Sequence, residues 1–104
     1  MTVKLTEKNI QKEVYDCRIP VLVEFYASWC PKCAMMEDVL QKFAIDHREI
    51  KVCQVNEGEQ PGLVNRFGIE RVPYFVAFVK GKPVGAAVGI VSENILLELF
   101  SAPK

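Results

Sequence analysis

The sequence predicts an α/β protein with a central mixed five-stranded sheet flanked by four helices, in the order β-α-β-α-β-α-β-β-α. Apolar, β-branched runs of strand length alternate with segments of helical period, which predicts parallel strands joined by crossover helices. Only Lys80-Gly81-Lys82 separates the last two apolar runs, which is typical of an antiparallel hairpin. The two kinds of connection together predict that the sheet is mixed.

The first half of the chain is predicted to form two strands and two helices. Residues 3–5 fit a short strand, and in the helix that follows Ile10 and Val14 share one face. Residues 21–27 (VLVEFYA) are apolar and rich in β-branched and aromatic residues, which predicts a central strand. A second helix extends to about His47. Its buried stripe is predicted to consist of Cys33, Met36, Leu40, Phe43 and Ala44.

The second half is predicted to add three strands and two helices. Residues 51–55 and 74–79 have strand character, and residues 61–67 fit a short helix that ends at Gly68. Residues 83–88 form the second strand of the hairpin. A last helix is expected to begin at a capping serine and to bury three apolar side chains. These residues are Ser92, then Leu96, Leu99 and Phe100.

Length and charge limit the class of protein. The chain has 104 residues, enough for a hydrophobic core of its own, and we expect one domain over residues 1–104. Its 13 basic and 13 acidic residues balance, so no positive field favours nucleic acid or an anionic membrane surface. The first ten residues do not resemble a secretory leader, and no apolar run has membrane-spanning length. We expect a cytoplasmic monomer that binds neither nucleic acid nor membranes.

The stretch Trp29-Cys30-Pro31-Lys32-Cys33 carries the clearest chemical signal. It lies between a predicted strand and a predicted helix, and Pro31 suits the first helical position. Cys30 is then the N-cap, where helix amides and the helix dipole favour the reactive thiolate. Cys33 lies one turn further along, so we expect Cys30 to be exposed and Cys33 to be buried behind it. This asymmetry predicts that Cys30 forms a mixed disulfide with a substrate and that Cys33 resolves it.

Metal binding and structural cross-linking are the alternatives for a Cys-x-x-Cys pair. A structural zinc takes four ligands, commonly as two close pairs, and this chain has only one such pair. Cys17, Cys53 and His47 show no ligand-like spacing with it, so no metal is expected. In a reducing compartment a close pair is more often catalytic or metal-binding than structural. Cys17 and Cys53 are expected to be small buried residues.

Three separated segments of the chain resemble the thioredoxin family. VLVEFYASWCPKC resembles the strand and active-site loop of that family, GIERVP resembles the segment with a cis-proline, and FVKGKPVGAAVG resembles the final hairpin. The resemblance implies the thioredoxin fold and a protein-disulfide reductase that transports electrons and maintains cell redox homeostasis. It implies Cys30 as the nucleophile and Cys33 as the resolving cysteine. No cofactor is implied besides their reversible disulfide.

The resemblance also implies roles for residues around the two cysteines. Trp29 would flank and shield the sulfurs. Pro73, in the cis form, would pack against the dithiol without an amide hydrogen that could compete for it. Val72 would offer backbone hydrogen bonds to a client chain that is added as a strand, and Gly89 would leave room for that chain.

Glu24 stands where the family usually has a buried aspartate. The residues around it are apolar on both faces of the strand, which indicates burial. Burial raises the pKa of a carboxyl and lets it exchange protons near neutral pH, so we expect Glu24 to accept the proton of Cys33. Gln54 replaces a lysine that lies near this acid in the family, and without that cation Glu24 should hold its proton more readily. The alternative is a strand acid with a surface partner.

Other departures from the family pattern concern the redox potential and the partners. Pro31 and Lys32 replace the common Gly-Pro, and the Lys32 cation would favour the Cys30 thiolate and so raise the redox potential. The alternative is that Lys32 points into water and has little effect. Arg71 and Tyr74 add charge and bulk where the family has smaller residues, which would obstruct some partners.

These observations predict a dithiol electron carrier that reduces disulfides of client proteins and is recharged by a donor of the thioredoxin-reductase type. Two alternatives stay open. One is a binding module that holds a narrow set of partners in the same groove, and the other is a more oxidising disulfide exchanger. The intact cysteine pair, together with Glu24 and Pro73, favours the electron carrier.

Overall fold

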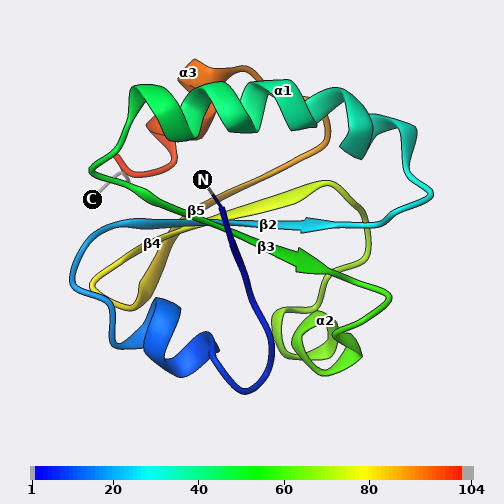
Figure 1. Ribbon diagram of the computed structural model, residues 1–104, viewed down its shortest axis with the longest axis horizontal. Coiled ribbons are helices and arrows are strands. Elements are labelled where there is room, and N and C mark those ends of the chain that lie inside the picture. Colours follow the sequence, from blue (N-terminus) through cyan, green and yellow to red (C-terminus); the bar gives the residue numbers. More distant parts are fainter. Residues whose placement is uncertain (1, 102–104) are drawn as a thin grey trace.

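The computed structural model describes residues 2–101, and the five strands and four helices of this part of the chain follow the predicted order (Figure 1). The strands are β1 (Thr2–Lys4), β2 (Val21–Tyr26), β3 (Lys51–Asn56), β4 (Tyr74–Val79) and β5 (Lys82–Val88). The helices are η1 (Gln11–Tyr15), α1 (Pro31–Asp46), α2 (Pro61–Phe67) and α3 (Glu93–Glu98). The first helix is a short π-helix. Both ends of the expected domain, Met1 and residues 102–104, lie outside the described residues.

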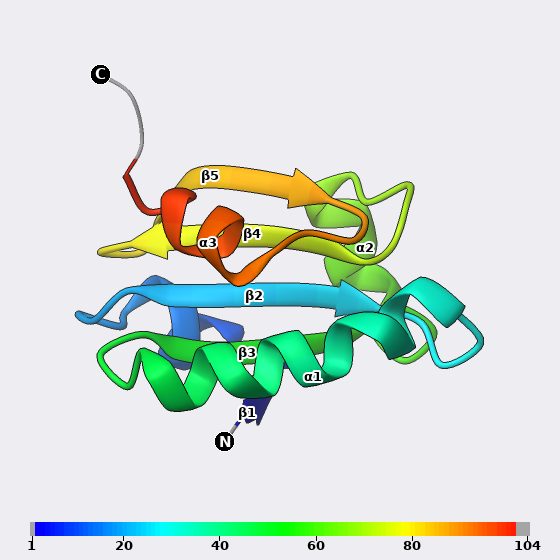
Figure 2. The ribbon, with the colours of Figure 1, turned by 90° about the horizontal axis from the view of Figure 1, so that it is seen from above.

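The strands form one mixed sheet in the order β1-β3-β2-β4-β5, which Figure 2 shows from above. β1 and β2 both pair in parallel with β3, as crossover connections require. β4 runs antiparallel to β2 and to β5, and β4 and β5 form the predicted hairpin. The prediction of a mixed five-stranded sheet is therefore confirmed. β2 lies in the middle with a partner strand on each side.

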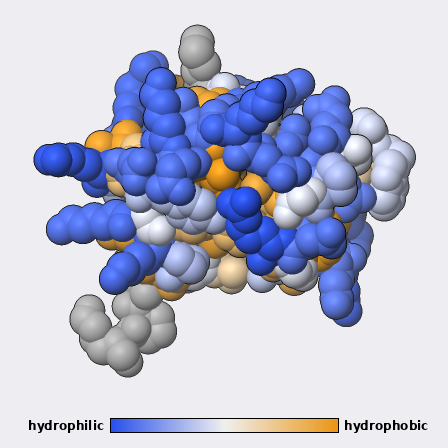
Figure 3. All heavy atoms as spheres, turned by 90° about the horizontal axis from the view of Figure 1, so that it is seen from below, coloured by the Kyte–Doolittle hydropathy of each residue, from blue (hydrophilic) through white to orange (hydrophobic). Residues whose placement is uncertain are grey.

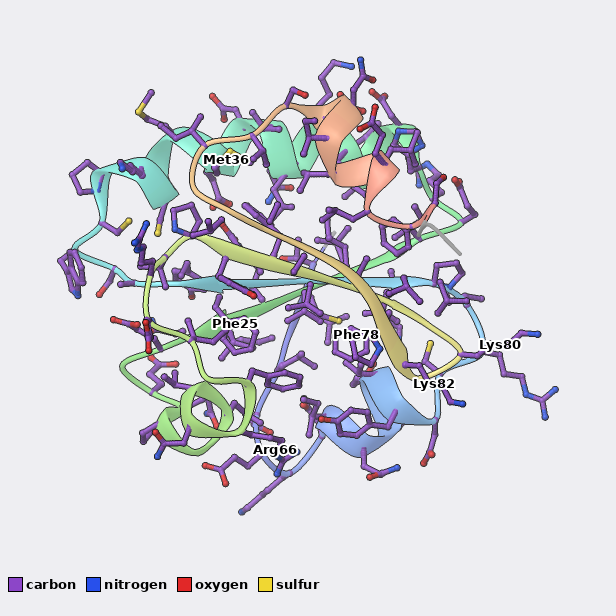
Figure 4. All side chains as sticks on the ribbon, turned by 180° about the vertical axis from the view of Figure 1, so that it is seen from behind. Phe25, Met36, Arg66, Phe78, Lys80 and Lys82 are labelled. Carbon is purple, nitrogen blue, oxygen red and sulfur yellow. The ribbon has the colours of Figure 1, made fainter. Side chains whose placement is uncertain are left out.

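Helices cover both faces of the sheet. α1 and α3 lie on one face, and η1 and α2 lie on the other (Figure 1). Each face has its own apolar cluster, one around Met36 of α1 and one around Phe25 and Phe78. Figure 4 shows these labelled side chains on opposite sides of the sheet. Each fully buried side chain of this size contributes about 1.5–3 kcal/mol to folding.

The helix signals in the sequence correspond to observed contacts. The buried residues of α1 are the five of the predicted stripe. Gly68 ends α2 with a left-handed backbone, φ 65° and ψ 38°. The Ser92 hydroxyl accepts a hydrogen bond of 3.2 Å from the amide of Ile95 and so caps α3. Leu96 is buried below that cap, as expected.

The two cysteines outside the active-site stretch differ in burial. Cys53 is fully buried in the cluster beneath η1 and α2, as expected. Cys17 is only half-buried, so the expectation of a buried residue is wrong for it. It follows η1 at the rim of that cluster and borders a surface hollow that Arg18 and Lys80 also line, which leaves one side of the thiol open.

The outer surface over η1 and α2 is mostly hydrophilic, with apolar side chains showing only in small areas (Figure 3). Among residues 2–101, no helix combines the length and the apolar character that crossing a membrane requires.

The turn between β4 and β5 lies close to the segment that contains η1. Lys80 and Gly81 both have positive φ values, 52° and 78°. A Cβ atom on Gly81 would overlap the backbone carbonyl oxygen of Tyr15. Gly81 is therefore required both by its backbone conformation and by this close approach.

We predict that Gly81→Ala destabilises the protein by about 3 kcal/mol, because left-handed strain adds to overlap with the Tyr15 backbone. Gly68→Ala is the matched control, because Gly68 has a similar φ of 65° and nothing within 4 Å of an added Cβ. The control should lose only about 1 kcal/mol. Urea-induced unfolding of both variants measures the difference, and equal losses would contradict the close approach.

Candidate active site

Cys30 lies between the end of β2 and the start of α1. It is the N-cap of α1, with an extended backbone at φ −95° and ψ 112°, and Pro31 occupies the first turn as predicted. The amide of Cys33 donates a hydrogen bond of 3.1 Å to the Cys30 Sγ. This bond and the positive end of the helix dipole stabilise a thiolate at Cys30.

The two sulfurs are almost equally buried. Cys30 is 7% exposed and Cys33 is 6% exposed, so the expectation that Cys30 is the exposed member of the pair is wrong. The Cys30 side chain turns inward to accept the Cys33 amide, and Val72 and Tyr26 pack against the pair. The Val72 carbonyl oxygen lies 3.8 Å from the Cys30 Sγ. The loop that carries Val72 therefore covers a sulfur that the helix position alone would leave open.

The asymmetry of the pair lies in its electrostatics. The pKa of Cys33 is raised to about 12. Burial is the largest cause, and the hydrogen bond with Cys30 is the second. The backbone of Ala27 acts in the opposite direction, and the nearby Glu24 carboxylate raises the pKa again. Cys33 is therefore a thiol at neutral pH, and it needs a proton acceptor before it can attack.

Glu24 lies beneath the cysteines in the centre of the sheet. It pairs in register with Gln54 of β3 and Phe75 of β4, and it is 2% exposed. The alternative of a surface acid is therefore wrong, because α1 covers this face of β2. The Gln54 Nε2 donates a hydrogen bond of 2.8 Å to the Glu24 Oε1.

Burial raises the pKa of Glu24 to about 7. The hydrogen bond from Gln54 lowers it, and the charge of Glu37 on α1 raises it slightly. A carboxyl with this pKa gives and takes protons readily at neutral pH. A cavity of about 170 Å³ is lined by Glu24, Cys30, Cys33 and Glu37, so the carboxyl and both sulfurs share one space.

A second segment lies against the cysteines from the start of β4. The Val72–Pro73 peptide bond is cis, as the resemblance implied. The Pro73 carbonyl accepts a hydrogen bond of 2.8 Å from the Gly89 amide, and Gly89 has φ +91° with open space around it. Arg71 is exposed and lines a hollow beside this segment, together with Tyr74 and Val88.

Trp29 and Lys32, which adjoin the cysteines in the sequence, are both exposed to solvent. Trp29 is 73% exposed, so the expectation that it shields the sulfurs is wrong for the free protein. It lies in the turn between β2 and α1, and Tyr26 and Val72 fill the place beside the cysteines instead. Lys32 is also exposed, and it makes no ion pair with any residue from 2 to 101.

Three residues near the site were not expected from the sequence. Tyr26 lies next to the cavity because it ends β2, and Glu37 faces the cavity from α1, four residues after Cys33. That helical spacing is a signal that could have identified Glu37. Thr2 reaches the site through a hydrogen bond to Gln54, and only the pairing of β1 with β3 reveals that contact.

Two sulfurs within one helical turn, beside a carboxyl that titrates near neutral pH, suit the exchange of thiols and disulfides. Within the described part of the chain, no group of three or more His, Cys, Asp or Glu side chains could hold a metal ion. The fold and the site together define the class of dithiol oxidoreductases.

Comparison with known proteins gives the family. A family model described as Thioredoxin matches residues 1–102. The chain is 31% identical over 99 residues to the thioredoxin of Rickettsia bellii, with 94% of each chain covered. It is 38% identical over 89 residues to the thioredoxin of Alicyclobacillus acidocaldarius, which covers 85% of this chain and 84% of that relative. It is 35% identical over 94 residues to thioredoxin 1 of a Nostoc strain, which covers 89% and 88%.

The chain belongs to the thioredoxin family. It is a thiol-disulfide oxidoreductase with protein-disulfide reductase activity, and its sheet and helices have the thioredoxin fold.

The raised pKa of Glu24 predicts how stability depends on pH. The pKa is about 7 in the folded protein and about 4.5 when the carboxyl is free. The folded state therefore keeps a proton that the unfolded state has lost, and stability falls as pH rises from about 4.5 through 7. Between about pH 5 and about pH 8 the loss is about 2–3 kcal/mol.

Glu24→Gln should remove this loss, because an amide does not titrate. We expect the unfolding free energies of wild type and variant to diverge by about 2–3 kcal/mol across this pH range. Urea unfolding of the disulfide form is the measurement, since no active-site thiol titrates in that form. Parallel pH profiles for the two proteins would contradict the assignment.

Proposed function

We propose that Cys30 attacks the disulfide of a client protein and that Cys33 completes the transfer. In the first step the Cys30 thiolate forms a bond to one client sulfur, and the client S–S bond breaks to release a client thiolate. In the second step Cys33 attacks the Cys30 sulfur and releases the second client thiolate. The client gains two electrons and two protons, and the Cys30–Cys33 dithiol becomes a disulfide. The hydrogen bond from the Cys33 amide to the Cys30 Sγ carries this assignment.

Glu24 is the proposed proton acceptor for the second step. The pKa of Cys33 is raised to about 12, so its thiol requires a base. Glu24 has a pKa of about 7 and borders the same cavity, so a large fraction of its carboxyl is ionised at neutral pH. The proton of Cys33 passes to this carboxylate as the sulfur attacks Cys30.

The client chain is proposed to bind along the segment that starts β4. Val72 offers backbone hydrogen bonds to an extended client strand, and Pro73 faces the dithiol without an amide hydrogen. Gly89, which directly follows β5, leaves space for the client, and the open surroundings of an added Cβ support this. The exposed ring of Trp29 is available to contact the client, and Arg71 favours acidic side chains next to the client disulfide.

The cellular setting completes the proposal. We propose a cytoplasmic, monomeric electron carrier formed by one domain over residues 1–104, with the reversible Cys30–Cys33 disulfide as its only redox group. Its partners are disulfide-containing client proteins and a donor of the thioredoxin-reductase type, and not nucleic acid or membranes. The relatives named thioredoxin support this setting.

Trapping of the mixed disulfide tests the order of the two cysteines. Cys33→Ser should accumulate a covalent complex with insulin. Cys30 still attacks an insulin disulfide in the first step, and the second step is blocked. Cys30→Ser should form none, and insulin reduction should fall at least about 1,000-fold in both variants. Non-reducing electrophoresis and a turbidity assay measure the two effects.

Cys17→Ser is the matched control, because it removes a half-buried thiol outside the site and should leave turnover unchanged. A stable complex formed by Cys30→Ser instead would reverse the assigned roles. A double Cys30→Ser, Cys33→Ser variant loses turnover. If it still binds clients with wild-type affinity, the result would favour the binding module.

Lys32 is proposed to raise the redox potential of the pair. A cation at the start of α1 favours the Cys30 thiolate and so favours the reduced form. Because Lys32 is exposed, the effect is small, and Lys32→Pro should lower the potential by about 5–20 mV. Equilibration with glutathione measures the potential.

Lys82→Gln is the control for net charge, because Lys82 lies at the start of β5, at the opposite end of the sheet from α1's first turn (Figure 1). The control should leave the potential unchanged. An unchanged or higher potential in Lys32→Pro would show that the lysine does not tune the pair.

A further inference from the structure

A row of hydrogen bonds crosses three strands and ends at the Glu24 carboxyl. The Thr2 hydroxyl donates to the Gln54 Oε1 at 3.0 Å, and the Gln54 Nε2 donates to the Glu24 Oε1 at 2.8 Å. We propose that Gln54, held in place by Thr2, is a positioning residue that fixes Glu24 Oε2 as the oxygen that exchanges the proton. The inference rests on the proposed role of Glu24 as the acceptor for Cys33.

The strand register places the three side chains on one face of the sheet. Gln54 pairs with Glu24 of β2 on one side and with Lys4 of β1 on the other. Thr2 lies two residues before Lys4, and residues two apart on a strand point to the same face. The chain of hydrogen bonds therefore runs across β1, β3 and β2 beneath the helix that carries the cysteines.

The Thr2 hydroxyl bonds the end of the Gln54 amide that faces β1. An amide side chain has an acceptor at its oxygen and donors at its nitrogen. Because the Thr2 hydroxyl donates to the Gln54 Oε1, that oxygen faces β1 and the nitrogen faces β2. Without the hydroxyl, the Gln54 oxygen loses this partner and the amide is held less firmly against Glu24.

The direction of the second bond decides which oxygen of Glu24 carries the proton. The Gln54 Nε2 can only donate, so the Glu24 Oε1 must accept and has no place for a proton on that side. No residue from 2 to 101 donates a hydrogen bond to Glu24 Oε2, and among these residues no buried side-chain oxygen lacks a partner. Oε2 therefore reaches the cavity that Glu24 shares with Cys33. The proton is left on the oxygen that faces the cysteines.

Among the described neighbours of Glu24, Gln54 is the group that opposes the rise in pKa caused by burial. From α1, Glu37 raises the pKa of Glu24, and from the same helix Cys30 and Cys33 line the shared cavity. From β4 the register partner is the apolar Phe75. From β1 the charged side chain on this face is Lys4, which is exposed and pairs in register with Gln54.

The test is the titration of the Glu24 carboxyl in the disulfide form, followed by NMR of ¹³C-labelled glutamate. Gln54→Leu removes the donor and should raise the midpoint by about one pH unit, a tenfold change in the protonation equilibrium. Gln54→Lys should lower the midpoint, because a cation favours the carboxylate. Thr2→Val should raise it by less than Gln54→Leu does, and Thr2→Ser, which keeps the hydroxyl, should restore the wild-type value.

Gln11→Leu is the matched control, because it makes the same change at an exposed glutamine that bonds Asp16 and should not move the midpoint. A midpoint unchanged in Gln54→Leu, or unchanged in Thr2→Val, would overturn the inference. A structural role for Thr2 alone would lower stability without moving the midpoint, and this result would also overturn it.

A separate measurement distinguishes failure of this inference from failure of the proposed function. The rate at which Cys33 resolves a preformed mixed disulfide should fall at least about tenfold in Glu24→Ala, with the first attack by Cys30 largely intact. Equal slowing of both steps, or none, would overturn the role of Glu24 as acceptor. The titrations of the Gln54 and Thr2 variants would still decide the positioning of the carboxyl, because they need no turnover.

Discussion

The pairing of β2 with a strand on each side is the constraint on which the site depends. A strand with two partners has no edge in water, so every side chain on it faces a helical layer. That placement forces the Glu24 carboxyl into the apolar interior, where a charge is costly. It also fixes the end of β2, and with it the first turn of α1, directly above the same carboxyl. A base and two sulfurs are thus brought together by one strand and the helix that follows it.

Burial controls the protonation of two groups in the site, the Glu24 carboxyl and the Cys33 thiol. Burial disfavours the charged form of both groups, the Glu24 carboxylate and the Cys33 thiolate, and so raises the pKa of each. The helix start stabilises charge at Cys30, only one turn from a sulfur that remains neutral. Neither cysteine would have its proposed role on an exposed helix, because both effects require the sheet below and the Val72 segment opposite.

The sequence allowed the fold to be predicted well because its signals are local. The stripe on α1, Gly68 after α2 and Ser92 before α3 each act within a few residues of themselves. The burial of Glu24 was also predictable, because apolar residues surround it along the chain. Contacts between distant segments were not predictable. The covering of Cys30 by Val72 and the bond from Thr2 to Gln54 depend on how β4 and β1 are placed, and no local pattern encodes that placement.

The low exposure of Cys30 affects which oxidants can reach its sulfur. A cysteine that is only 7% exposed presents little surface to peroxide or to a small disulfide that diffuses at random. A disulfide carried on an extended chain differs, because the proposed backbone pairing beside Val72 would hold one of its sulfurs at the remaining opening. Access to the sulfur thus depends on the shape of the approaching molecule. The low exposure of Cys30 therefore favours a disulfide on a client strand over small oxidants as its reaction partner.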